Sequence, residues 1–408
     1  MNLILHIGTE KTGTTSIQSF LKINRIALMQ NGIYVPQSTM TWSGNQRWLP
    51  IMANRDDYTD DFVKLQNFKN QEEKRKKIIQ KKAEFLLECQ NLSAKYHTLI
   101  LSSEHLQSRL TRKDEIQKLK ALLDKISHTV CIVVYIRDPL STAISHLSTM
   151  IKNGQTPQAL PAPNEKYYET ICNHAQTIKK WGDCFPEAKF IIRRFDKKSI
   201  INNNVIVDFC TQFIPNFKIK NYKLPVAVNT SLTLTGMKLL RKLNLKYPPY
   251  IENLPNPMRR DMTSFVMKNT SDGSKFLPSK EEYEAYHDHF AVSCENVREH
   301  YFPSEKSLFT QQYQFSNEKI DLREYDIDSS LSERLIYYLW EERTHRIADG
   351  DIYKIRDLAI KISEQKPLNL NDSLDLMRVA QKLNPQGHYI KKKIYEWEHL
   401  TGSNEPKS

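Results

Sequence analysis

The chain has 408 residues, of which 39% are hydrophobic and 26% charged, and its formal net charge is +12. That length suits two domains of roughly 100–200 residues each. The composition excludes wholesale disorder and collagen-like repeats. Membrane-spanning helices are also excluded, because such a helix needs about 20 consecutive apolar residues. The positive charge fits solvated helix faces or an anionic ligand, whereas the mixture of basic and aromatic residues typical of nucleic-acid binding is missing.

The six cysteines are scattered and form no C-x-x-C pair. The first residues show neither a basic segment nor a small-residue cleavage site, so no secretory signal is expected. We therefore predict a cytoplasmic protein with reduced thiols, no zinc site and no disulfide framework.

Short apolar runs alternate with helical patterns from the first residues onward. Because these runs are apolar throughout, they favour an α/β fold: a P-loop-like parallel sheet with helices on both faces. In such sheets ligands gather at the carboxyl ends of the strands. The expected strands are 3–7, 97–101, 130–136 and 189–193. The expected helices are 14–30, 64–90, 111–127 and 181–185. A further helix is expected to begin at Pro139, with Asp138 as its N-cap.

The pattern changes after about residue 325, where only helices are expected. The segment from Leu376 to Glu398 resembles a single tetratricopeptide-type helix pair. We therefore predict two domains, 1–325 with the sheet and 326–408 as a helical C-terminal extension. The helices expected in the extension are 331–346, 353–364, 374–383 and 388–399.

The segment GTEKTGTT, residues 8–15, follows the first expected strand and begins the first helix. In such a loop successive N–H groups can point at an anion, and the helix dipole adds positive charge. The two glycines have the spacing of the Walker A pattern, but Thr14 stands in the lysine position and Lys11 lies three residues earlier. We predict a phosphate-binding loop poorly suited to ATP hydrolysis; an ordinary strand-to-helix turn is the alternative.

Arg137 follows the third expected strand, and Ser145 lies eight residues later, on one helix face with Ser141 and Ser148. An arginine and a serine placed in this way can hold a phosphate. The alternative is an Arg137 paired with Asp138 or with a surface carboxylate. Two anion sites at strand ends of one sheet indicate a nucleotide with phosphates at both ends of its ribose.

The segments KTGTT and RDPLSTAIS resemble the two cofactor-binding elements of sulfotransferases that use 3′-phosphoadenosine 5′-phosphosulfate (PAPS). Four further segments, LILSSEHL, WGDCFPEAKFIIRRFD, NTSLTLTGMKLLRKLN and FAVSCENVREHYFPSEKSLF, resemble bacterial polysaccharide and lipopolysaccharide sulfotransferases over about residues 1–310. The resemblance implies metal-independent, in-line transfer from PAPS to a hydroxyl of a capsular or lipopolysaccharide sugar. It assigns the 5′-phosphosulfate to Lys11, Thr12, Gly13, Thr14, Thr15 and Ser16, and the 3′-phosphate to Arg137 and Ser145.

Sulfuryl transfer depends mainly on positioning and on stabilising developing charge. Lys11 suits the charge that grows on the leaving phosphate. Glu104 directly follows the expected strand 97–101, as a glutamate does in the heparan-type branch of the family, and is our preferred general base, with His105 as the alternative. Their structural alternatives are a helix N-terminal carboxylate and a packing histidine.

The chain departs from the family at Glu10, where the common loop has proline. A carboxylate beside a phosphosulfate is unfavourable unless it points outward, so Glu10 is left out of the predicted site. Arg193 and Arg194 follow a strand end, and one of them is expected to face an anionic acceptor. The expected sugar-stacking residues are Trp42, Trp48, Tyr167 and Tyr168.

Two other functions stay open. A P-loop kinase or NTPase would need a lysine in place of Thr14 and a Walker B aspartate after a strand. A catalytically silent nucleotide-binding scaffold would use the helical tail to recruit a partner. The sequence also leaves open the acceptor, the oligomeric state and peripheral association with a membrane surface.

Overall fold

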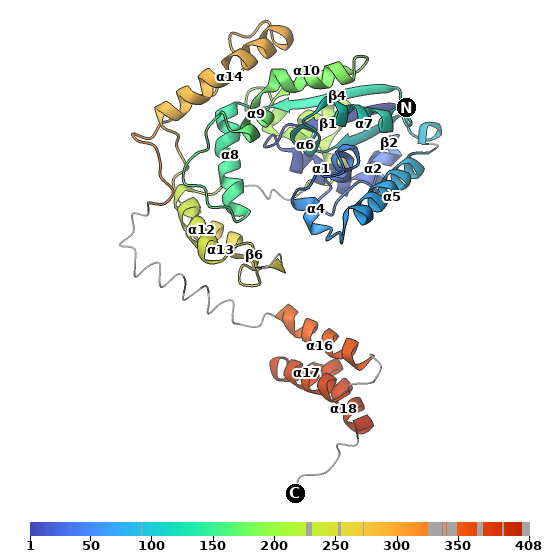
Figure 1. Cartoon of the computed structure of the whole chain (residues 1–408). Coiled ribbons are helices and arrows are strands. Elements are labelled where there is room, and N and C mark those ends of the chain that lie inside the picture. Colours follow the sequence, from blue (N-terminus) through green and yellow to red (C-terminus); the bar gives the residue numbers. More distant parts are fainter. Residues whose placement is uncertain are drawn as a thin grey trace. The chain divides into compact units, whose positions relative to one another are not determined.

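The computed structural model describes residues 1–90, 92–225, 231–251, 254–271, 273–324, 337, 340, 349–364, 370–385 and 387–401. The chain divides into two compact units (Figure 1). Unit 1 consists of 1–249 and 261–324, and unit 2 consists of 250–260 and the residues from 325 onward.

Unit 1 is built on a five-stranded sheet in the order β2-β3-β1-β4-β5. Every neighbouring pair is parallel, so the carboxyl ends of all strands lie at one edge. This confirms the predicted α/β fold; only the two-residue β2, too short to give a pattern, was not expected. The strands are β1 (Asn2–Gly8), β2 (Ile33–Tyr34), β3 (Thr98–Ser102), β4 (Thr129–Ile136) and β5 (Lys189–Arg194).

The helices of unit 1 follow the predicted alternation with strands, with some changes of boundary. The expected helix 14–30 is divided at Asn24, whose side-chain amide donates to the carbonyl oxygens of Phe20 and Lys223. The expected helix 64–90 is two helices, α4 and α5. The helices are α1 (Thr14–Ile23), α2 (Arg25–Gln30), α3 (Trp48–Ala53), α4 (Asp61–Leu65), α5 (Gln71–Cys89), α6 (His105–Arg109), α7 (Lys113–Leu123), α8 (Pro139–Lys152), α9 (Lys166–Cys172), α10 (His174–Cys184), α11 (Val205–Phe213), α12 (Leu234–Lys246), α13 (Met262–Asn269) and α14 (Lys280–Tyr301).

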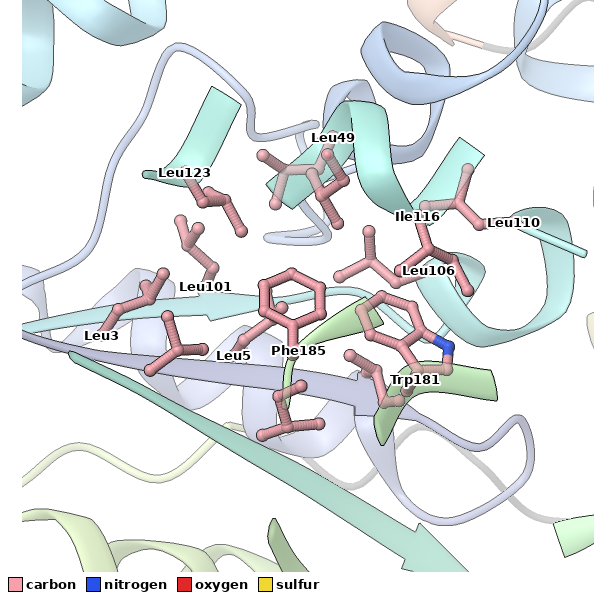
Figure 2. Packing of buried hydrophobic residues seen from close by; sticks show 14 of the residues in the cluster. Leu3, Leu5, Leu49, Leu101, Leu106, Leu110, Ile116, Leu123, Trp181 and Phe185 are labelled. Carbon is pink, nitrogen blue, oxygen red and sulfur yellow. The ribbon is translucent and has the colours of Figure 1, made fainter. Parts of the chain in front are cut away.

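Alternate residues of the central strands feed two hydrophobic cores, one on each face of the sheet. Leu3 and Leu5 of β1 belong to a core covered by α3, α5, α6, α7, α10 and α14. Ile4 of β1 belongs to a second core, covered by α1, α2 and α11. Figure 2 shows the first core, with Leu3, Leu5 and Leu101 of the sheet facing Leu49, Ile116, Trp181 and Phe185. Helices therefore cover both faces, which leaves the strand ends to form the site.

The described residues of unit 2 form three helices with a core of their own, to which Met377, Ala380 and Trp397 belong. They are α16 (Asp349–Ser363), α17 (Leu370–Leu383) and α18 (His388–Thr401), and they match three of the helices expected there. The fourth, 331–346, lies outside the described residues except for positions 337 and 340. The short strands β6 (Tyr250–Ile251) and β7 (Leu254–Pro255) pair antiparallel. Among the residues that the structure describes, no helix combines the length and the apolar character needed to cross a membrane.

Candidate active site

The loop between β1 and α1 presents a row of main-chain N–H groups that lack acceptors. Thr9 N donates to a carbonyl of β4, and the next bonded main-chain donor is Ser16 N, which donates to Gly13 O at 3.0 Å. The six N–H groups of residues 10–15 have no acceptor among the described residues. α1 begins at Thr14, so the last two of these N–H groups belong to its first turn, and the helix has no side-chain cap. Unpaired donors at the start of a ten-residue helix form a site for an anion.

Two glycines permit the shape of this loop. Gly8 has φ of 105°, and a Cβ there would lie 2.9 Å from the Cα of Glu104. Gly13 has φ of 76°, and a Cβ there would lie 2.9 Å from a side-chain carbon of Val205. A side chain at either position would meet both backbone strain and a collision. The glycines therefore bring the loop against Glu104 on one side and against α11 on the other.

The hydroxyl groups of the loop fall into two kinds. Thr12 is fully buried, and its Oγ1 donates to Thr9 O at 2.6 Å, so its side chain braces the loop from inside. The hydroxyls of Thr14, Thr15 and Ser16 have no partner within the described part of the chain. Thr12 can therefore donate only its main-chain N–H to an anion, whereas Thr14, Thr15 and Ser16 can also donate their hydroxyls.

Lys11 and Arg137 meet at the carboxyl edge of the sheet. Arg137 Nη1 donates to Lys11 O at 2.9 Å. Lys11 Nζ reaches α8 and donates to Thr149 Oγ1 at 2.6 Å, one helical turn beyond Ser145. Burial lowers the pKa of Lys11 to about 8, opposed by the nearby Glu10 and assisted by Arg137. The two predicted anion elements thus lie in one place.

The three serines of α8 differ in what their hydroxyls contact. Ser141 Oγ shares a hydrogen bond of 2.6 Å with the hydroxyl of Tyr313. Ser148 Oγ accepts from Leu232 N at 2.9 Å. Ser145 is half-buried, and its hydroxyl has no partner among the residues described. Of the three, Ser145 is therefore the one whose hydroxyl is free to bind a ligand; its role toward a 3′-phosphate stays a prediction.

Glu104 lies between β3 and α6 and is fixed from two directions. Its Oε2 accepts from Gln18 Nε2 of α1 at 2.6 Å and from Asn45 Nδ2 at 2.8 Å. Its Oε1 lies 3.6 Å from His105 Nε2. Glu104 is the N-cap residue of α6, the position of the alternative given above, but its side chain makes no capping hydrogen bond to that helix. The carboxylate is held in place with one oxygen available for chemistry.

Glu10 points into the protein, so the expectation that its side chain would point outward was wrong. The residue is buried, its Oε2 accepts from the hydroxyl of Tyr167 at 2.6 Å, and its Oε1 lies 3.5 Å from Arg109 Nη1. Burial opposes ionisation of Glu10, but His105, Arg109 and the hydrogen bond from Tyr167 outweigh it and lower its pKa to about 2. An ionised carboxylate therefore lies inside the site, held by Tyr167 and Arg109.

His105 lies between the two glutamates. Its Nδ1 is 4.0 Å from Glu10 Oε1, on the side opposite Glu104. Burial lowers the pKa of His105, while both carboxylates act in the other direction. The ring is therefore neutral near pH 7 and is able to accept a proton.

The two arginines at the end of β5 are not free to face an acceptor, contrary to the expectation for one of them. Arg193 Nε donates to Oδ2 of the fully buried Asp208 at 3.1 Å. Arg194 Nη2 donates to Glu305 Oε1 at 2.8 Å. The Arg193 guanidinium stabilises the fold, since the buried Asp208 would be costly if unpaired, whereas the partner of Arg194 has a partly exposed side chain.

The aromatic residues expected to stack on a sugar also separate into groups. Trp48 and Tyr168 are buried in the interior, with 6% and 1% exposed. Tyr167 is engaged with Glu10. Trp42 is 87% exposed and lies three residues before Asn45, which contacts Glu104. Trp42 is therefore the member of this group that is open to a ligand.

Sequence reasoning missed several residues that shape the site. The Phe195 ring lies 5.7 Å from the guanidinium of Arg137 and borders Gly13. Phe195 follows the end of β5, the one sequence signal that would have found it. The side chains that hold Glu104 and Glu10 come from separate elements and carry no such signal. They are Gln18, Asn45, Arg109 and Tyr167.

The site thus has two sides with different chemistry. We call the N–H groups of residues 10–15 together with Lys11, Arg137 and Ser145 the anion side. We call Glu104, His105 and Glu10 the proton side. Across the described ranges, no three His, Cys, Asp or Glu side chains gather in a way that would hold a metal ion.

Comparison with known proteins gives little beyond this geometry. No family model matches the chain. An uncharacterized protein of Archaeoglobus fulgidus is 26% identical over 200 residues, which are 47% of this chain and 52% of that protein, so the chain spans about half of the relative's length. The crystal structure of a sulfotransferase from Alicyclobacillus acidocaldarius is similar with a TM-score of 0.33 and 13% identity, over 60% of this chain and 93% of that one. A TM-score and a sequence identity this low do not indicate a shared activity.

Proposed function

We propose that this chain is a sulfotransferase that moves a sulfuryl group from PAPS to a hydroxyl of a carbohydrate acceptor. The observation that carries the proposal is the meeting of two anion-binding elements at the strand ends. Arg137 donates to the carbonyl of Lys11, and Lys11 reaches α8 one turn from Ser145. A nucleotide with phosphates on both sides of its ribose is the ligand that uses both elements together.

The donor would be held by cations at the strand ends together with N–H and hydroxyl groups that have no partner among the described residues. The six N–H groups of residues 10–15 and the Lys11 ammonium would bind the 5′-phosphosulfate, because clustered N–H donors and a cation suit an anion. Arg137 and Ser145 would bind the 3′-phosphate through a guanidinium fork and a hydroxyl. Phe195, beside Arg137 and Gly13, offers its ring to the nucleobase.

The transfer itself needs a base and a group that stabilises the leaving phosphate. Glu104 would take the proton of the acceptor hydroxyl through Oε1, because its Oε2 is occupied by Gln18 and Asn45. The acceptor oxygen would then bond to sulfur while the bond from sulfur to the 5′-phosphate breaks. Lys11 and the loop N–H groups would stabilise the charge that grows on that phosphate.

A sugar acceptor fits the surroundings of Glu104. Trp42 is exposed on the same short loop that delivers Asn45 to Glu104, and the main-chain carbonyl of Trp42 accepts a hydrogen bond from Lys22 Nζ. An exposed, anchored indole ring suits the apolar face of a sugar ring. The resemblance of the sequence to bacterial polysaccharide sulfotransferases supports the same substrate class.

Calorimetric titration with 3′-phosphoadenosine 5′-phosphate, compared with ADP and carried out without metal, tests the proposal. We expect tight binding that is lost when the 3′-phosphate is absent. Preference for ADP, or binding that requires Mg²⁺, would contradict the proposal and favour a P-loop kinase or NTPase. Tight binding without sulfuryl transfer to any of a panel of saccharides would favour a silent nucleotide-binding scaffold.

A further inference from the structure

Two buried polar atoms of the proton side face each other without a hydrogen bond. His105 Nδ1 and Glu10 Oε1 are both buried, and neither makes a hydrogen bond among the described residues, although Arg109 Nη1 lies 3.5 Å from Glu10 Oε1. They lie 4.0 Å apart. Buried donors and acceptors are almost always paired in folded proteins. Two complementary unpaired atoms at this separation therefore indicate a hydrogen bond that a small shift of either side chain completes.

We propose that Glu10 is a positioning residue: it holds His105 with its proton on Nδ1, so that Nε2 is free to take the acceptor proton from Glu104. This inference rests on the proposed sulfuryl transfer and extends it. His105 then acts as a proton relay behind the base.

In the environment of Glu10, only Oε1 remains to accept a hydrogen bond from His105 Nδ1. Its Oε2 is occupied by the hydroxyl of Tyr167, and Arg109 lies 3.5 Å from its Oε1, which holds the carboxylate against α6. Since an ionised carboxylate is a hydrogen-bond acceptor only, the atom that faces it must carry a proton. Glu10 Oε1 therefore favours the Nδ1–H form of His105. By the same rule Glu104 Oε1, 3.6 Å from Nε2, favours the Nε2–H form. We give Glu10 the greater weight because the buried Nδ1 makes no other hydrogen bond, whereas Glu104 already accepts hydrogen bonds from Gln18 and Asn45.

The other side of the ring is prepared in a matching way. His105 Nε2 lies 3.6 Å from Glu104 Oε1, while Glu104 Oε2 is taken by two amide donors. With the proton on Nδ1, the lone pair of Nε2 points toward the oxygen that receives the acceptor proton. The order of atoms is Glu10 Oε1, Nδ1, Nε2 and Glu104 Oε1.

The charges around His105 suit a ring that starts neutral and becomes protonated. Glu10 faces it from the loop, Glu104 from its own turn, Arg47 from the start of α3 and Arg109 from α6. Burial keeps the resting ring neutral, and the two guanidinium groups act in the same direction. The imidazolium formed on proton transfer lies between two carboxylates, which stabilise it.

The relay balances as follows. The acceptor O–H bond breaks and its proton goes to Glu104 Oε1. The acceptor oxygen bonds to sulfur, and the electron pair of the breaking sulfur–oxygen bond leaves with the 3′,5′-bisphosphate. The proton then passes from Glu104 Oε1 to His105 Nε2 and afterwards to water, so Glu104 is again ionised for the next turnover.

The tautomer of His105 tests the proposal without any activity measurement. The full chain labelled with ¹⁵N-histidine is examined by long-range ¹H–¹⁵N spectroscopy near pH 7.5, with the His105 signal assigned from His105→Gln. We expect Nδ1–H in the wild type and a shift toward Nε2–H in Glu10→Gln. His174 is an internal reference for the opposite form, because its Nε2 donates to Arg137 O at 2.8 Å.

A matched variant separates the carboxylate from its anchor. Tyr167→Phe removes a hydrogen bond to Glu10 but keeps the charge, so the Nδ1–H form of His105 should persist. An Nε2–H form in the wild type would overturn the proposal. A tautomer that changes in Tyr167→Phe as much as in Glu10→Gln would overturn it as well, because general loosening would then explain both.

Kinetics provide the second readout. Glu10→Gln should lower kcat about tenfold, less than the roughly 10²- to 10⁴-fold of a group that transfers the proton itself, because Glu10 acts through His105. The KM for PAPS should stay within about twofold. The acidic limb of its pH–rate profile should move to lower pH, because the carboxylate that stabilises the imidazolium is lost. An unmoved limb in an enzyme that transfers sulfate would overturn this inference alone. Absence of transfer by the wild type would overturn the proposed function and leave the tautomer result as it stands.

Discussion

The two sides of the site differ in how far the fold satisfies their polar groups. On the anion side, six main-chain N–H groups and the hydroxyl of Ser145 have no partner in the described structure. On the proton side, Glu104 and Glu10 are held by side chains from other elements. The first arrangement leaves donors available to a ligand, and the second fixes the direction of a carboxylate before any ligand arrives.

This difference separates binding from chemistry. Unpaired N–H groups at the start of a helix acquire hydrogen bonds only when an anion binds, so the anion side should govern nucleotide affinity. Fixed carboxylates contribute when a proton moves, so the proton side should govern rate. Lys11 belongs to the anion side by position, but in the proposed transfer its ammonium would stabilise the leaving phosphate, so it should affect rate first. Variants from both sides test this division.

The largest expected effect comes from Lys11→Ala. Losing the cation that stabilises the leaving phosphate should lower kcat by about 10²- to 10³-fold, as for an oxyanion-stabilising donor. The affinity for 3′-phosphoadenosine 5′-phosphate should change far less, because six N–H groups remain. Turnover at saturating PAPS and calorimetric affinity are compared. Equal losses in both would mean that Lys11 only binds.

Removing the base should be nearly as severe. Glu104→Gln should lower kcat by about 10²-fold, the lower range for a general base, with unchanged nucleotide affinity. The variant keeps the size of the side chain, so the contacts of α6 should survive, as far-ultraviolet circular dichroism would show. Unchanged turnover after alanine substitution of both Glu104 and His105 would contradict the assignment of the base.

Arg137→Ala should reverse this balance between rate and affinity. A charge-assisted hydrogen bond contributes about 1.5–3 kcal/mol, so the affinity for 3′-phosphoadenosine 5′-phosphate should fall roughly 10- to 100-fold. Affinity for ADP, which lacks the 3′-phosphate, should change little in the same titration. Normal affinity for the 3′-phosphorylated nucleotide would refute this role of Arg137.

The positions of these three residues were predictable because each lies in a stretch that follows a strand end. Lys11 follows β1, Glu104 follows β3 and Arg137 follows β4. Parallel strands present their carboxyl ends at one edge, so residues far apart in sequence meet without any further information. The alternation of apolar runs with helical patterns therefore predicts the sheet and brings these three residues to one edge of it.

The directions of the side chains were not predictable in the same way. Asn45 lies 59 positions before Glu104 in a polar stretch with no pattern, yet it holds that carboxylate. Glu10 turns inward because Tyr167 and Arg109 meet it from α9 and α6. Each contact depends on the packing of whole elements, and no local rule of sequence encodes that.

The pKa of Lys11 gives the anion side a pH dependence. Because burial lowers this pKa to about 8, the ammonium is charged below pH 8 and neutral above it. The value of kcat/KM for PAPS should therefore fall as pH rises through about 8, reaching about a tenfold loss at pH 9. Rates from pH 6 to 10 are measured for the wild type and for Lys11→Arg.

The arginine variant is the control for this limb. Its guanidinium stays protonated over the whole range, so its profile should show no alkaline fall, even if its overall rate is lower. A wild-type profile that is flat to pH 10, or an alkaline fall that persists in Lys11→Arg, would contradict the role assigned to the ammonium.

The smallest effect separates two serines of the same helix. Ser145→Ala should weaken binding of 3′-phosphoadenosine 5′-phosphate roughly two- to tenfold, from the loss of about 0.5–1.5 kcal/mol. Its free energy of unfolding in urea should stay within about 0.5 kcal/mol of the wild type, since the hydroxyl has no partner in the described structure.

Ser148→Ala should give the opposite pair of results. This substitution leaves Leu232 N buried without its acceptor, which costs about 1–3 kcal/mol in the free energy of unfolding. Nucleotide affinity should not change, because the Ser148 hydroxyl already has a partner inside the protein. If Ser148→Ala weakened nucleotide binding, or Ser145→Ala lowered stability, an unpaired hydroxyl would not indicate a ligand-binding position on α8. The division of the site into an anion side and a proton side would then lose its basis.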